Sequence, residues 1–178
     1  MKNILIILML TLTYSVASAQ YKPIDKGSML QFNIKNLGFG VSGKFTGFKG
    51  SINFDAQSPA NGSFDVTIDA GTVNTDNSLR DSHLRDASYF DVQKYPVIRF
   101  VSSKINPADK TGTFNMSGKL TIKDVTRDVS FPFTATTLSD GYIFKGSFKI
   151  NRKDFGVGGT STISNELEVL LDVVAVKG

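Results

Sequence analysis

A regular alternation of apolar and polar residues is the sequence feature that most limits how this chain can fold. Leu30, Phe32 and Ile34 alternate with polar neighbours, and the same period of two returns in segment after segment of the chain. A period of two places apolar side chains on one face of a β-strand and polar side chains on the other. The pattern therefore predicts an all-β protein in which each strand has one buried face and one face in water.

We expect eight strands in a single domain. They lie near residues 28–35, 39–55, 62–70, 97–106, 112–123, 127–138, 142–151 and 165–176. The dipeptides Asn61-Gly62 and Asp140-Gly141 are typical of tight hairpins, so sequential strands are expected to pair antiparallel. Closing eight antiparallel strands into a barrel leaves no exposed sheet edge, and we predict that arrangement.

One of these strands changes the phase of its alternation. The apolar positions are odd-numbered at Val41 and Phe45 but even-numbered at Phe48, which requires one extra residue in the strand. We place a β-bulge at Thr46-Gly47, because Gly tolerates the backbone conformation that a bulge needs.

A short stretch between the third and fourth strands has helical spacing instead. Residues 78–87 place their apolar side chains at helical intervals, and Asp76 or Asn77 precedes them as a cap. This predicts a short amphipathic helix that interrupts the barrel, with an ion pair between Asp81 and Arg85 one turn apart.

The first 19 residues have the features of an export signal. Lys2 provides a positive start, residues 4–12 form an apolar run, and Ala17-Ser18-Ala19 fits the small residues that precede a cleavage site. The run is too short to span a membrane, so no stable membrane insertion is expected. We therefore predict a signal peptide at residues 1–19 and a barrel domain at residues 20–178, in the periplasm or outside the cell.

Composition excludes several kinds of function. The sequence holds no Cys and a single His, so thiolate sites and multi-histidine metal cages cannot form within one chain. The net charge is +4 and the basic residues are spread along the chain, so a nucleic-acid partner is not expected. Gly38, Gly40 and Gly43 have the spacing of a dinucleotide-binding loop, but a strand pattern follows where such a loop needs a helix. We expect no cofactor, no metal and no catalytic residue.

The one histidine, His83, has two interpretations. Its spacing from Leu79 and its place beside Leu84 favour a structural role, with a half-buried ring hydrogen-bonded across the junction between helix and barrel. A single His can also serve as a general base or contact a ligand.

The barrel interior also has two interpretations. An eight-stranded barrel is just wide enough to be filled by its own side chains or to hold one slender ligand, and the alternation leaves both open. The residues expected to face inward and to line a ligand site are Phe32, Ile34, Phe39, Phe45, Phe64, Phe100, Met116, Phe131, Phe133, Phe144 and Phe148.

Several blocks of the sequence, taken in order, resemble the YceI-like family of exported, lipocalin-like bacterial proteins. The blocks are residues 34–39, 43–48, 80–85, 89–92, 94–96 and 150–158. The resemblance implies an extended eight-stranded antiparallel barrel whose hydrophobic pore holds a polyisoprenoid or fatty-acyl amphiphile, commonly as a periplasmic homodimer. It also implies that Asn36 stands where the family commonly has His. A polar head group at the mouth of the pore would then lie near Arg80, His83, Arg85 and Arg152.

Three functions are weighed on this basis. The first is an exported carrier, store or scavenger that binds a polyisoprenoid, an isoprenoid quinone or a fatty-acyl compound without catalysing a reaction. The second is an interaction or stress-response protein with a solid barrel, which would present an apolar patch on its outer face. The third is a cofactor-free enzyme, such as an isomerase, which would need a titratable group inside the pore. We expect the first, with the inward-facing residues above and His83 as ligand contacts.

Overall fold

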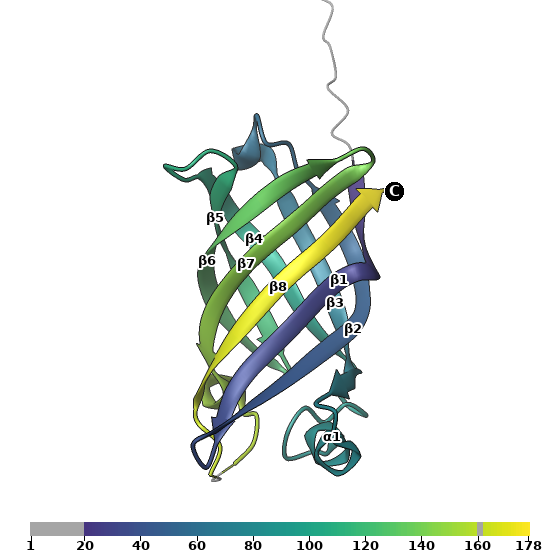
Figure 1. Cartoon of the computed structure of the whole chain (residues 1–178), viewed down its shortest axis with the longest axis vertical. Coiled ribbons are helices and arrows are strands. Elements are labelled where there is room, and N and C mark those ends of the chain that lie inside the picture. Colours follow the sequence, from purple (N-terminus) through teal and green to yellow (C-terminus); the bar gives the residue numbers. More distant parts are fainter. Residues whose placement is uncertain (1–19, 160–161) are drawn as a thin grey trace, which may run out of the picture.

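Eight antiparallel strands close into one barrel, in which each strand pairs with its neighbours along the chain and β8 pairs with β1 (Figure 1). The computed structural model describes residues 20–159 and 162–178. Its strands are β1 (Gln20–Asn36), β2 (Phe39–Asn53), β3 (Ser63–Asn74), β4 (Val97–Pro107), β5 (Thr113–Ile122), β6 (Val125–Leu138), β7 (Gly141–Asn151) and β8 (Glu166–Lys177). Its helices are η1 (Pro59–Asn61), α1 (Ser78–Arg85) and η2 (Arg152–Phe155). The predicted fold class and the predicted helix are confirmed, whereas the predicted export signal lies outside the described residues.

The two ends of the barrel differ (Figure 1). One end carries α1, the turn between β1 and β2, and the segment that follows η2, and we call it the α1 end. The opposite end, which we call the closed end, carries η1 and the C-terminus. The backbone N–H of Gly178 donates to the carbonyl of Gln20 at 3.0 Å, so the first and last described residues meet at the closed end.

The predicted bulge in β2 is confirmed. The register between β2 and β3 shifts on both sides of Thr46, and Gly47 has φ +77°, a conformation that Gly adopts without strain. The backbone N–H groups of Gly47 and Phe48 both donate to Oδ1 of Asp25, at 2.8 and 2.9 Å. The carboxylate on β1 thus satisfies the two donors that the bulge removes from the β-ladder.

Strand β1 begins at Gln20, well before the predicted residue 28. Its register against β8 shifts between Ile24 and Met29, and Gly27 within this irregularity has φ +82°. Inward-facing positions are therefore odd-numbered near Tyr21 and even-numbered from Leu30 onward. Because this irregularity interrupts the alternation, the first half of β1 was not predicted from the sequence.

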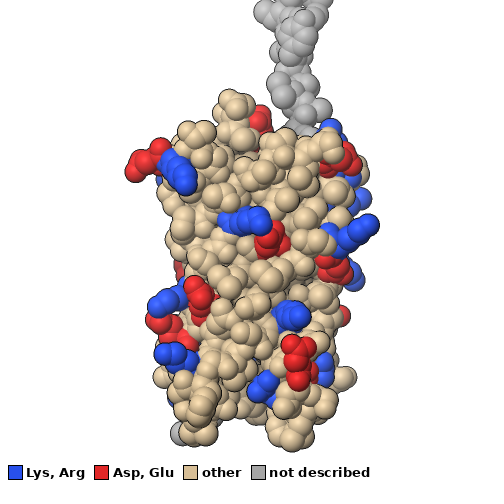
Figure 2. Space-filling view, in the orientation of Figure 1, with Lys and Arg blue, Asp and Glu red and all other residues tan. Residues whose placement is uncertain are grey.

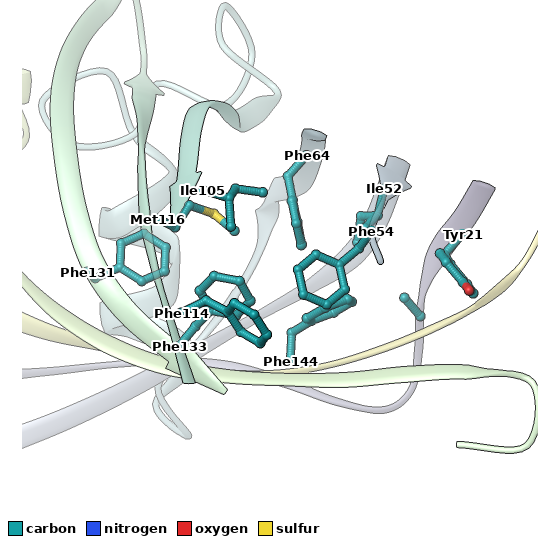
Figure 3. Packing of buried hydrophobic residues seen from close by; sticks show 11 residues of the cluster. Tyr21, Ile52, Phe54, Phe64, Ile105, Phe114, Met116, Phe131, Phe133 and Phe144 are labelled. Atoms are coloured by element: carbon teal, nitrogen blue, oxygen red, sulfur yellow. The ribbon is translucent and has the colours of Figure 1, made fainter. Parts of the chain in front are cut away.

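Aromatic rings fill the closed end of the barrel. Phe54, which follows β2, is 3% exposed and contacts five rings with centroids 5.2 to 6.1 Å away, all in edge-on geometry. Edge-on contacts between rings add to the energy of burial. The five partners are Phe64, Phe114, Phe133, Tyr142 and Phe144, and together with Phe54 we call them the aromatic plug. Figure 3 shows these rings apart from Tyr142. Burial raises the pKa of the Tyr142 phenol.

The outer face of the barrel is polar and carries both signs of charge. Positive and negative side chains are interspersed on the face shown in Figure 2. Ion pairs such as Arg99–Asp65 and Lys145–Asp172 join neighbouring strands, and the hydrogen bond from Arg99 lowers the pKa of the Asp65 carboxyl. These pairs are solvent-exposed, so each adds little to stability. Within the described ranges, no helix is long and apolar enough to cross a membrane.

The aromatic plug is expected to supply much of the stability of the barrel. Phe54→Ala removes the ring at its centre and should lower the free energy of unfolding by about 3 to 5 kcal/mol. The matched change Phe39→Ala removes a ring that is 76% exposed and should alter it by less than about 0.5 kcal/mol. Urea denaturation of both variants measures the difference, and equal losses would contradict the central role of Phe54.

Candidate ligand-binding cavity

The barrel interior is open toward the α1 end. A cavity of about 400 Å³ begins among α1, the end of β1 and the segment after η2, and extends into the barrel between apolar side chains such as Ile34, Phe45 and Val169. We call it the outer cavity. Its volume lies in the range of small-molecule sites in proteins.

A second cavity of about 120 Å³, the inner cavity, lies deeper in the barrel. Its lining includes Phe100, Met116 and Phe131, and also Phe64, Phe133 and Phe144 from the aromatic plug. The interior is therefore packed at the closed end and open at the α1 end, which answers the question that the alternation left open.

Inward-facing glycines help to keep the interior open. A Cβ at Gly43 would lie 2.3 Å from Cζ of Phe32, and a Cβ at Gly118 would lie 2.5 Å from Cζ of Phe100. In each case the ring from a neighbouring strand occupies the space that a side chain would take, as aromatic residues do beside strand glycines. The two rings consequently lie against the barrel wall.

Polar side chains gather at the mouth of the outer cavity. They include Asn36 at the end of β1, Asn77 at the start of α1, and Arg80 and His83 on the helix itself. The deeper lining comes from β-strand residues and is apolar, including Leu120, Phe148 and Val169. The site thus has a polar entrance and an apolar interior.

A buried carboxylate fixes α1 beside this mouth. Asp81 accepts hydrogen bonds from the backbone N–H of Thr75, at 2.8 Å, and from the Thr75 hydroxyl. Arg80 donates from Nε to the Thr75 hydroxyl oxygen and from Nη2 to the Thr75 carbonyl. The predicted Asp81–Arg85 ion pair is wrong, because the Thr75 donors at the end of β3 take the carboxylate into the interior.

Two further arginines hold the chain around the mouth. Arg85 donates to the carbonyls of Gly71 and Val73 at 2.7 Å, which ties the last turn of α1 to β3. Arg152 is buried, lines the outer cavity and donates to several backbone carbonyls of the following segment, including those of Val157 and Ser164. Of the four predicted head-group donors, Arg85 does not line the cavity, whereas Arg80, His83 and Arg152 do.

His83 lies at the mouth of the outer cavity, and its side chain is exposed. The prediction of a half-buried, hydrogen-bonded ring is wrong, because the contacts between α1 and the barrel are made by Arg80, Asp81 and Arg85. No hydrogen bond from the His83 ring occurs among the described residues. The imidazole is therefore available to a ligand in the cavity.

The structure places most of the predicted lining residues in the interior. Phe32, Ile34 and Phe45 line the outer cavity, Phe148 lines both cavities, and the inner cavity takes Phe64, Phe100, Met116, Phe131, Phe133 and Phe144. Their contact with a ligand stays a prediction.

The inward position predicted for Phe39 is wrong. Phe39 is the first residue of β2 and is 76% exposed. Pairing between β2 and β3 begins only at Lys44, so the β1–β2 hairpin extends beyond the neighbouring strand and gives the Phe39 ring nothing to pack against. Phe39 shares the odd-numbered phase of the inward residues of β2, but its ring nevertheless lies outside the barrel.

Some lining residues lie outside the strands and were not predicted from the sequence. Leu84 and Phe90 come from the segment between β3 and β4, and Val157 and Ile163 come from the segment after η2. Ile163 reaches the mouth because it forms an isolated β-bridge with Asn36. The only signal in the sequence was the presence of large apolar residues in segments without strand alternation.

The described residues bring no three acidic or histidine side chains together in a way that would bind a metal.

The model of the YceI-like domain matches residues 21–175, nearly the whole described barrel. The chain belongs to the YceI-like family. A UPF0312 protein of Pseudomonas aeruginosa is 32% identical over 170 residues, which cover 90% of this chain and 88% of the relative.

Solved structures of YceI-like and related barrels share the fold. BcnA of Burkholderia cenocepacia superposes with a TM-score of 0.77 at 28% identity, over 82% of this chain and 94% of BcnA. A polyisoprenoid binding domain from Saccharophagus degradans has a TM-score of 0.73 at 15% identity, over 91% of this chain and 100% of that domain. The second similarity is one of fold alone.

The Asp81 contacts predict a specific local effect. Asp81→Ala leaves the buried Thr75 N–H without its acceptor, which should destabilise the protein by about 1 to 3 kcal/mol. Hydrogen exchange should become faster at Thr75 and along α1 while β5 to β7 stay protected. The control Asp86→Ala changes an exposed carboxylate at the end of the same helix and should leave exchange unaltered, so equal effects of the two changes would refute the anchoring role.

Proposed function

We propose that this YceI-like protein binds one amphiphile with a long apolar tail, as an exported carrier, store or scavenger. The outer cavity carries the proposal, because it is open at one end, apolar inside and polar only at its entrance. The tail lies inside the barrel, among the inward-facing side chains of the strands, and the head group lies beside Asn36, Arg80 and His83. A polyisoprenoid, an isoprenoid quinone or a fatty-acyl compound has the required form.

Hydrophobic burial is sufficient to drive such binding. Each methylene group removed from water contributes about 0.8 kcal/mol, so a tail of about a dozen methylenes gains roughly 10 kcal/mol before the costs of association. Side chains such as Phe45, Leu120 and Val169 offer only apolar contacts, so the interior favours a tail over a polar molecule. The name of the Saccharophagus degradans neighbour, a polyisoprenoid binding domain, agrees with this class of ligand.

We propose binding without catalysis. The residues that line the outer cavity in the described part of the chain include no Asp or Glu, so a carboxylate acid–base pair has no place in that lining. The open interior also favours a ligand-binding role over the alternative of a solid barrel that acts through its outer face. The features of residues 1–19 support a location in the periplasm or outside the cell.

Recovery of the natural ligand tests the proposal directly. Protein purified without detergent or denaturant should yield, by native mass spectrometry and by solvent extraction, an amphiphile in a near-stoichiometric amount. Protein that is repeatedly empty and that binds no fatty alcohol would overturn the proposal. Light scattering of the same samples tests the homodimer that the family resemblance implies.

A pair of adjacent substitutions tests the position of the tail. Ile34→Asp introduces a charge into the wall of the outer cavity and should weaken binding of a saturated fatty alcohol by at least about tenfold, or 1.4 kcal/mol. Lys35→Asp introduces an aspartate on the outer face of the barrel and should leave the affinity for the alcohol unchanged. Displacement of anilinonaphthalene sulfonate measures both, and equal weakening would exclude the predicted orientation of the wall.

A further inference from the structure

The outer and inner cavities share part of their lining. Leu30, Leu120 and Phe148 are the residues that line both cavities, and we call them the waist. They come from β1, β5 and β7. In the closed order of eight strands, β1 and β5 lie on opposite sides, so the waist takes side chains from opposite walls of the barrel.

Phe148 is the large side chain of the waist, and other rings hold it in place. Its ring stacks on that of Phe131, with centroids 4.6 Å apart and planes at 17°. Phe131 is buried and in turn contacts Phe100, at 5.8 Å between centroids. Phe100 lies over Gly118 on the barrel wall. The position of Phe148 is thus set by a row of rings that ends on the wall.

The inner cavity suits the end of an apolar chain. Its lining is apolar apart from Thr67. An enclosed apolar cavity of about 150 Å³ accepts a benzene molecule. The inner cavity, at about 120 Å³, is smaller and is bounded on its far side by the aromatic plug. It has room for a short terminal portion of a tail.

We propose that Phe148 determines how long a tail the barrel accepts. Its ring narrows the passage between the cavities, so the outer cavity takes the bulk of the tail and only its terminal carbons pass Phe148 into the inner cavity. This inference rests on the proposed function, since it concerns the same ligand. It assigns tail-length selection to one side chain, whereas the mouth selects the head group.

A homologous series of saturated fatty alcohols tests this selection. Affinity should rise about fourfold for each methylene that enters the cavity, and it should stop rising when the available space is filled. Phe148→Ala joins the two cavities and should move this limit to tails longer by roughly three methylenes, because the lost ring leaves space that the wall refills only in part. Phe148→Leu should move the limit in the same direction by less, and it carries the test if the Ala variant does not fold.

Two other variants separate the waist from its surroundings. Val173→Phe adds a ring inside the inner cavity and should shorten the longest accepted tail without weakening shorter ones. Phe90→Ala removes a ring from the outer cavity alone and should weaken all tails similarly with no change of limit. The inference would be overturned if neither Phe148→Ala nor Phe148→Leu changed the longest accepted tail. It would also be overturned if Phe90→Ala changed that length as much as Phe148→Ala does. Failure of the unmodified protein, shown to be empty, to bind any alcohol would instead overturn the proposed function.

Discussion

The width of a closed ring of eight strands is the constraint on which the rest of this structure depends. Such a ring has a lumen that its own side chains can fill, so the shape of the interior is decided by where the large rings point. At the closed end, Phe54 contacts rings from four different strands and fills space inside the barrel. Toward the α1 end, Phe32 and Phe100 lie on inward glycines of the wall and leave the axis free. One architecture thus provides both a packed core and a binding cavity.

The two ends consequently have different tasks. Rings and aliphatic side chains at the closed end bury apolar surface and stabilise the barrel. At the α1 end, the irregular segments are held mainly by hydrogen bonds between buried or half-buried side chains and the backbone. Asp81 accepts from the Thr75 N–H, and Arg85 donates to the carbonyls of Gly71 and Val73. These bonds position the mouth without filling the interior, which a larger apolar core at that end would do.

The alternation was sufficient to predict most of the fold. It located all eight strands, the change of phase at Phe48 revealed the bulge, and the helical spacing after residue 77 revealed α1. It failed where geometry departs from a period of two, as in the irregular part of β1 around Gly27. It also failed at Phe39, where the parity is correct but the hairpin extends beyond its neighbour. Whether the lumen is open depends on contacts between strands far apart in the sequence, which no local pattern reports.

The site was predictable to a similar degree. Inward parity identified ten strand residues that line the two cavities, because parity alone decides which face of a barrel wall a side chain takes. The prediction omitted other inward strand residues, such as Leu30 and Leu120, which line both cavities. The contributions of Leu84, Phe90 and Ile163 were not predictable, since they depend on how irregular segments fold over the mouth. The role of Asp81 was misjudged for the same reason, because its partner Thr75 lies outside the helix and becomes adjacent only in three dimensions.

The meeting of Gln20 and Gly178 at the closed end has a practical consequence for assembly and engineering. A second domain, an affinity tag or a surface tether joined directly before Gln20 or after Gly178 would be attached opposite the entrance. The mouth would then face away from the attachment point, so loading and unloading could proceed while the barrel is immobilised. An array of such barrels on a solid support would present every opening to the solution.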